Sequence, residues 1–284
     1  MENLLEVKNL SKRFEDSEFQ LRDINFNIHR GEVVALIGRN GCGKSTSMKT
    51  VVGTTIKTAG EIWFKDQLVD SEMSKHRNQI GVVFDTMKFP EKLTALELSR
   101  YFNRIYDQWE SDTYKSYLEY FNLPKDRQLK KFSRGMSMKL TFAVALSHRS
   151  ELLILDEATA GIDVTSKEEI LEHLETYVDR GNGILISSHM SEDIEKIADT
   201  LVFLRNGNVQ LTVSKQDLYE KYFIGETTLD DLSSIPKSAV YAYHERKGSV
   251  KLVLTEPINV EGVDVSNIQT IDDVTKILMR GKLV

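Results

Sequence analysis

One stretch decides the fold of this chain: Gly38-Arg39-Asn40-Gly41-Cys42-Gly43-Lys44-Ser45-Thr46. It follows an apolar run at 33–37 and precedes a helix-compatible segment, so the expected order is strand, glycine-rich loop, helix. In that order, G-x-x-x-x-G-K-[ST] binds phosphate. Glycines lack Cβ atoms, so consecutive N–H groups can surround one anion, and the new helix adds the positive end of its dipole. The bland alternative, a glycine-rich turn that matches by chance, is disfavoured by the flanking strand and helix.

The positions of this loop have distinct expected roles toward a bound nucleotide. Lys44 is long enough to reach the β- and γ-phosphates, and the Ser45 hydroxyl can hold Mg²⁺. We interpret Cys42 as a tolerated small residue in a loop that needs small residues. The nucleotide-binding positions expected in the loop are Gly38, Asn40, Gly41, Cys42, Gly43, Lys44, Ser45 and Thr46.

A second segment, Leu152-Leu153-Ile154-Leu155-Asp156-Glu157, is an apolar run that ends in two acids. A run without alternation suits a parallel strand covered on both faces, and open α/β sheets place their chemistry at the carboxyl ends of such strands. We expect Asp156 to hold Mg²⁺ through water and Glu157 to orient and deprotonate the attacking water. Two acids that merely solvate a strand end are the alternative, which the presence of Lys44 in the same chain weakens.

Two further segments complete an ordered series of motifs. Phe132-Ser133-Arg134-Gly135-Met136 precedes a helical run, and an apolar strand pattern at 184–188 ends at His189. The order is phosphate loop, Ser-x-Gly, hydrophobic-Asp-Glu, then His. In this order and spacing, residues 1 to about 213 resemble the ATP-binding subunit of an ABC transporter. The resemblance implies an α/β P-loop NTPase core of the ABC ATPase type, with an antiparallel β subdomain and a helical subdomain over about 87–150.

The resemblance also implies roles for residues outside the loop. Two cassettes would sandwich ATP, with Ser133 and Gly135 of one chain facing the nucleotide of the other. His189 would contact the γ-phosphate, and Asp163 would belong to the loop that crosses the dimer interface while also capping a helix near 164. Phe14 would stack on adenine, which needs only a ring face. A β-strand aromatic in the core is the alternative for Phe14.

The sequence departs from the family at two places. The strand 80–84 is followed by Asp85, where the family has Gln. An aspartate can ligate Mg²⁺ and accept a hydrogen bond, but it cannot donate one as an amide does. The Ser-x-Gly segment is loose, since Arg134 and Met136 replace the commoner Gly and Gln. Ser133 and Gly135, which would carry the phosphate contact, are present.

Composition limits the class of protein. The chain has 284 residues, 40% of them hydrophobic, and a formal net charge of −6, which disfavours a nucleic-acid surface. Its one cysteine cannot form an internal disulfide, so a reducing cytoplasm is expected. The stretch at 1–7 is unlike a signal peptide, and no apolar run approaches membrane-spanning length. We therefore expect the membrane-spanning permease subunit to be another chain and this one to lie on the inner face of the membrane.

The remaining segments carry no chemical motif. Aromatic residues at helical spacing between 101 and 121 predict the core of the helical subdomain and the wall of a partner groove, rather than a ligand platform. Residues 214–284 predict a small α/β appendage with a helix near 215–222, strands near 240–244 and 250–254, and a helix near 271–279. Stabilising a dimer, contacting regulators and a passive role stay open for it.

We expect an ATPase that closes as a homodimer or heterodimer around MgATP and drives a membrane partner. The loose Ser-x-Gly segment resembles subunits of bacterial exporters of peptides and antibiotics. Two alternatives stay open: a soluble ABC-type ATPase outside transport, and a non-hydrolysing regulatory cassette, for which Asp85 is the motive. The soluble relatives carry two cassettes or long coiled coils, and neither feature is present here.

Overall fold

The computed structural model describes residues 2–69, 76–84, 88–159, 161–188 and 191–284. A mostly parallel central sheet has the strand order β10-β9-β3-β8-β7-β6. Its strands are β3 (Val33–Ile37), β6 (Ile80–Phe84), β7 (Leu152–Asp156), β8 (Gly183–Ser187), β9 (Thr200–Arg205) and β10 (Asn208–Ser214). All neighbours are parallel except β9 and β10, so β3 and β6–β9 end at one edge of the sheet.

Each buried strand of the central sheet contributes to two hydrophobic cores. Leu152 and Ile154 of β7 belong to a core that includes helix α1 (Lys44–Val51). Leu153 and Leu155 belong to the other core, on the opposite face. Successive strand side chains point to opposite faces, so burial on both faces requires an apolar run without alternation, which the sequence has.

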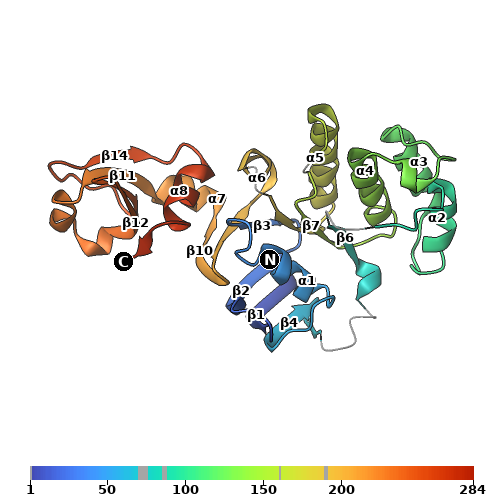
Figure 1. Ribbon diagram of the computed structural model, residues 1–284, viewed down its shortest axis with the longest axis horizontal. Coiled ribbons are helices and arrows are strands. Elements are labelled where there is room, and N and C mark those ends of the chain that lie inside the picture. The colour runs from blue at the N-terminus through green and yellow to red at the C-terminus, as the bar shows by residue number, and fades with distance from the viewer. Residues whose placement is uncertain (1, 70–75, 85–87, 160, 189–190) are drawn as a thin grey trace.

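An antiparallel sheet of order β2-β1-β4-β5 lies on the α1 side of the central sheet (Figure 1). Its strands are β1 (Asn3–Arg13), β2 (Gln20–His29), β4 (Ala59–Phe64) and β5 (Gln67–Leu68). The 3₁₀ helix η2 (Arg77–Gln79) precedes β6. The expected antiparallel β subdomain is therefore confirmed.

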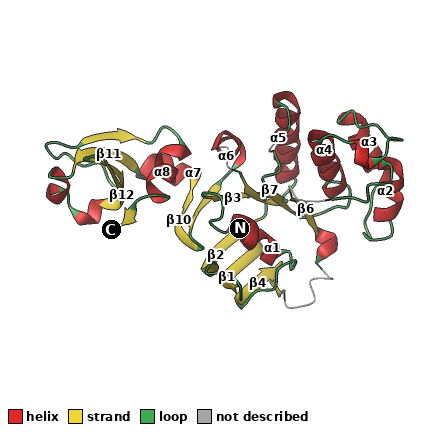
Figure 2. Ribbon diagram, in the orientation of Figure 1, coloured by secondary structure: helices red, strands yellow, loops and turns green. Residues whose placement is uncertain are grey.

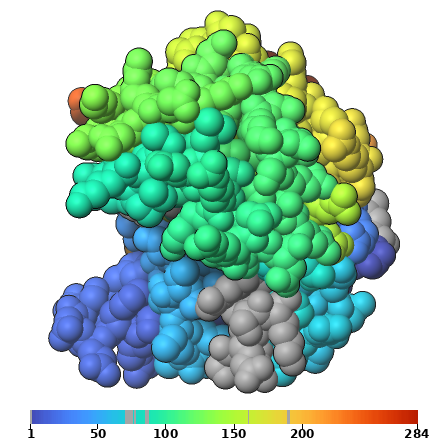
Figure 3. All heavy atoms as spheres, turned by 90° about the vertical axis from the view of Figure 1, so that its right-hand side faces the viewer, coloured from blue at the N-terminus to red at the C-terminus, as the bar shows by residue number. Residues whose placement is uncertain are grey.

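Helices from residues 95–145 gather at one end of the molecule, and the helices as a group cover the opposite face (Figure 2). They are α2 (Ala95–Phe102), α3 (Ser111–Tyr120), η3 (Leu129–Lys131), α4 (Arg134–Ala145), α5 (Val164–Asp179) and α6 (Ser191–Ile197). The rings of Phe102, Tyr106 and Trp109 stack within this part, and Tyr114 is fully buried. These aromatic residues form a core, as predicted. Viewed from this end, the helical part overhangs the N-terminal part (Figure 3).

The C-terminal segment forms a third sheet, antiparallel throughout, in the order β14-β11-β13-β12-β15. Its elements are α7 (Lys215–Lys221), β11 (Phe223–Thr228), η4 (Asp231–Ser234), η5 (Lys237–Ala239), β12 (Val240–Arg246), β13 (Ser249–Leu254), β14 (Asp264–Asn267), α8 (Ile271–Leu278) and β15 (Lys282–Leu283). Helix α8 packs on this sheet and joins the core of the central sheet, because Val274 and Ile277 share a cluster with Phe203 of β9. In the described ranges, no helix has the length and apolar character that crossing a membrane requires.

Candidate active site

The loop between β3 and α1 depends on glycine at two of its positions. Gly41 has φ of 80° and Gly43 has φ of 118°, a region that side chains with a Cβ rarely adopt. A Cβ on Gly43 would also lie 2.5 Å from Cδ2 of Leu21. At position 38 glycine is required for a different reason, because a Cβ there would lie 2.3 Å from the carbonyl oxygen of Leu204 on β9. The glycines therefore serve the turn and its packing against neighbouring strands.

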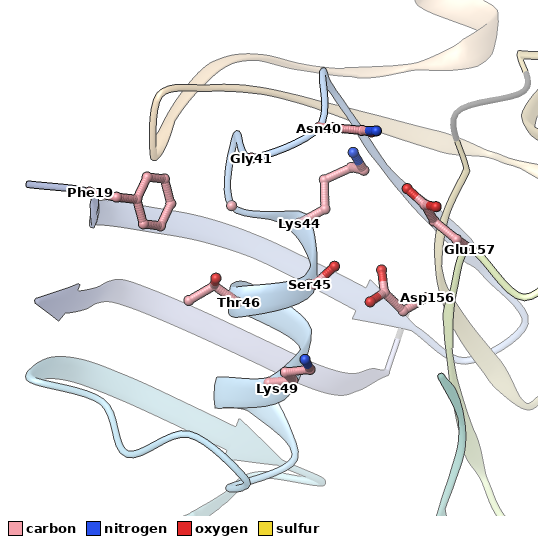
Figure 4. Close-up of a pocket in the computed structure, with 10 residues that line it drawn as sticks. Phe19, Asn40, Gly41, Lys44, Ser45, Thr46, Lys49, Asp156 and Glu157 are labelled. Atoms are coloured by element: carbon pink, nitrogen blue, oxygen red, sulfur yellow. The ribbon is translucent and has the colours of Figure 1, made fainter. Parts of the chain in front are cut away.

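This loop forms one wall of a cavity of about 500 Å³, and the end of β7 forms another (Figure 4). The residues that line the cavity are Phe19, Asn40, Gly41, Gly43, Lys44, Ser45, Thr46, Lys49, Asp156 and Glu157. In Figure 4 the Ser45 hydroxyl points toward the Asp156 carboxylate. The structure thus brings the predicted lysine, serine and two acids to a single cavity.

Lys44 is held inside the loop that it follows. Its side chain is buried, and its Nζ donates a hydrogen bond of 2.8 Å to the carbonyl oxygen of Gly38. Lys49, further along α1, is a second lysine in the lining and is not among the residues predicted from the sequence. Two cations and the N-terminus of α1 make one side of the cavity suited to a polyphosphate.

The two acids at the end of β7 are held by strand β8. Asp156 is 8% exposed, and the hydroxyl of Ser187 donates a 2.6 Å hydrogen bond to its Oδ1. Glu157 has φ of 50°, an uncommon conformation for a residue with a Cβ, and its N–H points to the carbonyl and hydroxyl oxygens of Ser187 at 3.1 and 3.2 Å. This turn carries the chain out of the sheet and leaves both carboxylates on the cavity wall.

Cys42 takes no part in lining this cavity. It is buried in the core beneath the loop, and that burial raises the pKa of its thiol above the usual value. A thiol with a raised pKa stays protonated and unreactive at neutral pH. The interpretation of Cys42 as a tolerated small residue is consistent with this environment.

The aromatic residue that lines the cavity is Phe19, directly before β2, and it is not among the residues predicted from the sequence. Phe14 lies next to it, with ring centroids 6.4 Å apart, but does not line the cavity. Phe14 is 36% exposed, and Nζ of Lys12 lies 5.0 Å from its ring centroid. No local sequence signal separates the two residues, because only the folding of β2 against the loop brings Phe19 near Gly43.

Ser133 and Gly135 lie outside this cavity. Ser133 is the exposed N-cap of α4, and its Oγ accepts a 3.2 Å hydrogen bond from the Met136 N–H. A Cβ on Gly135 would be 3.5 Å from the carbonyl oxygen of Gly161. Asp163 caps α5 by accepting a 3.0 Å bond from the Ser166 N–H, as expected. The Ser-x-Gly segment and the segment after Glu157 thus adjoin each other.

Two predicted site residues, Asp85 and His189, lie outside the described residues, so their roles stay predictions. Strand β6 ends one residue before Asp85, and strand β8 ends two residues before His189. β6 and β8 flank β7, and Phe84 and Ser187 are both in register with Asp156. Both strands therefore end beside Asp156.

Comparison with known proteins agrees with this geometry. A family model described as ABC transporter matches residues 21–160. The lantibiotic transport ATP-binding protein SrtF of Streptococcus pyogenes is 33% identical over 232 residues, covering 81% of this chain and 95% of that protein. The linearmycin resistance ATP-binding protein LnrL of Bacillus subtilis is 29% identical over 236 residues, covering 81% of this chain and 75% of that protein.

The comparison of structures gives the same result. A solved structure described as the ATP-binding subunit of an ABC transporter matches with a TM-score of 0.71 and 31% identity, over 76% of this chain and 92% of that one. The family resemblance seen in the sequence and the predicted P-loop NTPase fold are both confirmed. This chain belongs to the family of ATP-binding, ATP-hydrolysing subunits of ABC transporters.

Proposed function

We propose that this ATPase subunit binds ATP together with Mg²⁺ in the cavity between the glycine-rich loop and the end of β7. The observation that carries the proposal is that Lys44, Ser45, Asp156 and Glu157 line one cavity. Lys44 and the loop N–H groups would neutralise phosphate charge, while Ser45 and Asp156 would hold the metal. Mg²⁺ would offset charge on the phosphates when bound. Glu157 would orient and deprotonate the attacking water.

Three further residues have proposed roles at this site. His189 would steady the γ-phosphate, and Asp85 would add an oxygen ligand near the metal. For the adenine we propose the paired rings of Phe14 and Phe19, because Phe19 lines the cavity and Phe14 lies beside it. A base stacked on one ring would extend toward the other.

A second cassette would complete each nucleotide site. Ser133 and Gly135 are at the N-terminus of α4 and outside the cavity of their own chain, which supports a role toward the nucleotide of a partner. The partner would be a second copy of this chain or a related cassette. ATP would close the pair, and hydrolysis would reopen it.

A membrane-spanning permease would be the third component. Tyr101, near the end of α2, and Ile105, in the turn after it, are each 49% exposed, although their neighbour Phe102 is buried. We propose that this surface and the segment around Phe89 receive a short helix of the permease at the inner face of the membrane.

The proposed cargo is a peptide or an antibiotic, carried outward. The names of SrtF and LnrL, which refer to lantibiotic transport and linearmycin resistance, support this proposal. Residues 1–213 would act as the cassette, with a helical subdomain over about 87–150, and residues 214–284 as a separate unit attached to it.

The test of hydrolysis is Glu157→Gln, which keeps shape and removes basicity. We expect turnover to fall by at least about 100-fold, with ATP binding retained and an ATP-dependent dimer on size exclusion. Glu175→Gln, on the exposed face of α5, is the matched control and should behave as wild type. Turnover of the Glu157→Gln protein near wild type would remove Glu157 as the base.

The test of the dimer is Ser133→Arg. It should leave ATP binding to the monomer intact and prevent the ATP-dependent dimer, since the larger side chain would occupy the space of the partner's phosphate. Equal loss of monomer affinity would contradict the shared site.

The test of permease docking is Tyr101→Ala, which should lower permease-stimulated hydrolysis and leave basal hydrolysis unchanged. Tyr120→Ala, at an exposed tyrosine on α3, is the control. Asp85→Asn should preserve ATP binding and alter the response of hydrolysis to the permease. If Asp85→Ala changes neither basal nor stimulated hydrolysis, Asp85 has no coupling role.

A further inference from the structure

Ser187, the last residue of β8, contacts both acids of the candidate site and has no role in the proposal above. It is fully buried. Its Oγ lies 2.6 Å from Oδ1 of Asp156 and 3.2 Å from the N–H nitrogen of Glu157. Its carbonyl oxygen accepts from the same N–H at 3.1 Å. One residue thus holds two consecutive residues of the neighbouring strand end.

The direction of these hydrogen bonds follows from chemistry. A hydroxyl has one proton and two lone pairs, while an ionised carboxylate can only accept. The Ser187 proton therefore points to Asp156, and a lone pair of Oγ faces the Glu157 N–H. A bond from a buried hydroxyl to a carboxylate is short and strong, and the 2.6 Å distance fits that description. It restrains rotation of the Asp156 carboxylate by holding Oδ1 toward β8.

The backbone of Glu157 needs support at this place. With φ of 50°, Glu157 has a left-handed conformation that a residue with a Cβ adopts only when its surroundings impose it. The two acceptors on Ser187 lie where the Glu157 N–H points in that conformation. Removal of the hydroxyl would leave one acceptor and would free the Asp156 carboxylate to rotate.

We propose that Ser187 is a positioning residue that presets Asp156 for Mg²⁺ and Glu157 for the attacking water. The inference rests on the proposed role of Asp156 toward the metal. Hydrogen-bond partners of metal ligands typically change metal affinity or activity by about 10- to 100-fold when they are removed. The competing explanation is that Ser187 is only a satisfied buried hydroxyl at a strand end, in which case stability alone would respond.

The experiment compares Ser187→Ala with wild type in the full chain. Binding of a fluorescent ATP analogue is measured with and without Mg²⁺, and hydrolysis is measured across a Mg²⁺ titration. We expect the Mg²⁺ concentration for half-maximal activity to rise about 10-fold and the maximal rate to fall. Nucleotide affinity without Mg²⁺ should stay within about two-fold, because Ser187 does not line the cavity. Ser187→Thr, which retains a hydroxyl, should restore the Mg²⁺ response.

The matched control is Ser147→Ala. Ser147 is also fully buried, and its hydroxyl donates to the Ala143 carbonyl in α4, away from the cavity. The Ser147→Ala variant should have lower thermal stability and an unchanged Mg²⁺ titration. An unchanged Mg²⁺ titration in Ser187→Ala, or an equal loss of affinity with and without Mg²⁺, would overturn the inference.

Asp156→Asn separates this inference from the proposed function. If Asp156→Asn leaves the Mg²⁺ titration unchanged, the metal role of Asp156 fails. If Asp156→Asn shifts it and Ser187→Ala does not, only the role of Ser187 fails. Should Ser187→Ala fold poorly, Ser187→Cys supplies the same measurement, since a thiol is a weak donor and should give an intermediate shift.

Discussion

The central sheet and the C-terminal sheet differ in what their topology can place at one edge. In the central sheet the parallel strands β3, β7 and β8 end at the same edge, so the residues that follow them converge. In the C-terminal sheet all neighbours are antiparallel, and successive strand ends alternate between opposite edges. The cavity with Lys44 and Asp156 takes no lining residue from the C-terminal sheet. Parallel pairing, more than composition, concentrates the chemistry in one region.

The two regions nevertheless share the core around α8 and several hydrogen bonds, some of them made by one residue of α6. Glu195 accepts a 2.6 Å hydrogen bond from the Ile271 N–H at the start of α8, and the Tyr219 hydroxyl of α7 donates to its carboxylate at 2.6 and 2.7 Å. Burial and the neighbouring Glu195 raise the pKa of Tyr219, so the hydroxyl remains a donor. In the sequence, α6 begins two residues after His189, so Glu195 lies on the helix that follows the predicted γ-phosphate contact.

The largest contrast is expected between two lysines. Lys44→Ala should lower ATP turnover by about 100-fold or more, because a preorganised cation is lost from a buried phosphate site. Lys251→Ala, on the C-terminal sheet, removes an exposed lysine paired with Glu226 and should leave turnover within two-fold of wild type. The rate of phosphate release measures ATP turnover in both variants. A comparable loss from Lys251→Ala would show that the C-terminal sheet takes part in hydrolysis.

The next contrast concerns packing on α8 and on the C-terminal sheet. Ile277 lies in the core shared with the central sheet, whereas Leu252 lies in a separate cluster within the C-terminal sheet. Ile277→Ala and Leu252→Ala should each cost about 2–5 kcal/mol of stability. Hydrogen exchange should rise in both regions for Ile277→Ala and mainly in β11–β13 for Leu252→Ala. The same exchange pattern in both variants would mean that the two regions unfold as one unit.

A smaller effect is expected at the link through Glu195. Glu195→Ala leaves the Ile271 N–H and the Tyr219 hydroxyl without their acceptor, which should cost about 1–3 kcal/mol and speed hydrogen exchange at the start of α8. Glu192→Ala, at an exposed position of the same helix, is the control. If both variants exchange as wild type does, the link contributes nothing to attachment.

The smallest contrast concerns two glutamates and pH. Burial pushes the pKa of Glu151 up, but hydrogen bonds from Lys65 and Arg30 outweigh it, and the pKa lies below its ordinary value of 4.5. A lowered folded-state pKa gives stability that is present above about 4.5 and is lost as pH falls through the folded value. Glu151→Gln should therefore cost about 1 kcal/mol at pH 7 and progressively less as the pH falls below about 4.5. Glu226→Gln, in an exposed pair, should cost nothing measurable by thermal unfolding.

Much of the candidate site was predictable because its signals are local in sequence. The glycine-rich loop, the apolar strand before Asp156 and the cap at Asp163 each follow from a few adjacent residues, and the structure shows them in place. Phe19 and Ser187 were not predictable. Phe19 enters the cavity only because β2 folds against the loop, and Ser187 meets Asp156 only because β8 pairs with β7. Cross-strand register cannot be predicted from a short stretch of sequence.

The C-terminal segment also combines features that the sequence determined with features that only the tertiary structure decided. The sequence determined the hairpin at Lys247-Gly248, where both residues have positive φ, and the helix near 271, whose apolar residues recur at helical spacing. The tertiary structure decided that β11, β14 and β15 complete the sheet and that α8 joins the central core, because short edge strands and shared cores depend on distant partners. Local patterns specify turns and element types through backbone sterics and side-chain periodicity. Which elements meet depends on burying those surfaces against one another, and that free energy exists only in the folded chain.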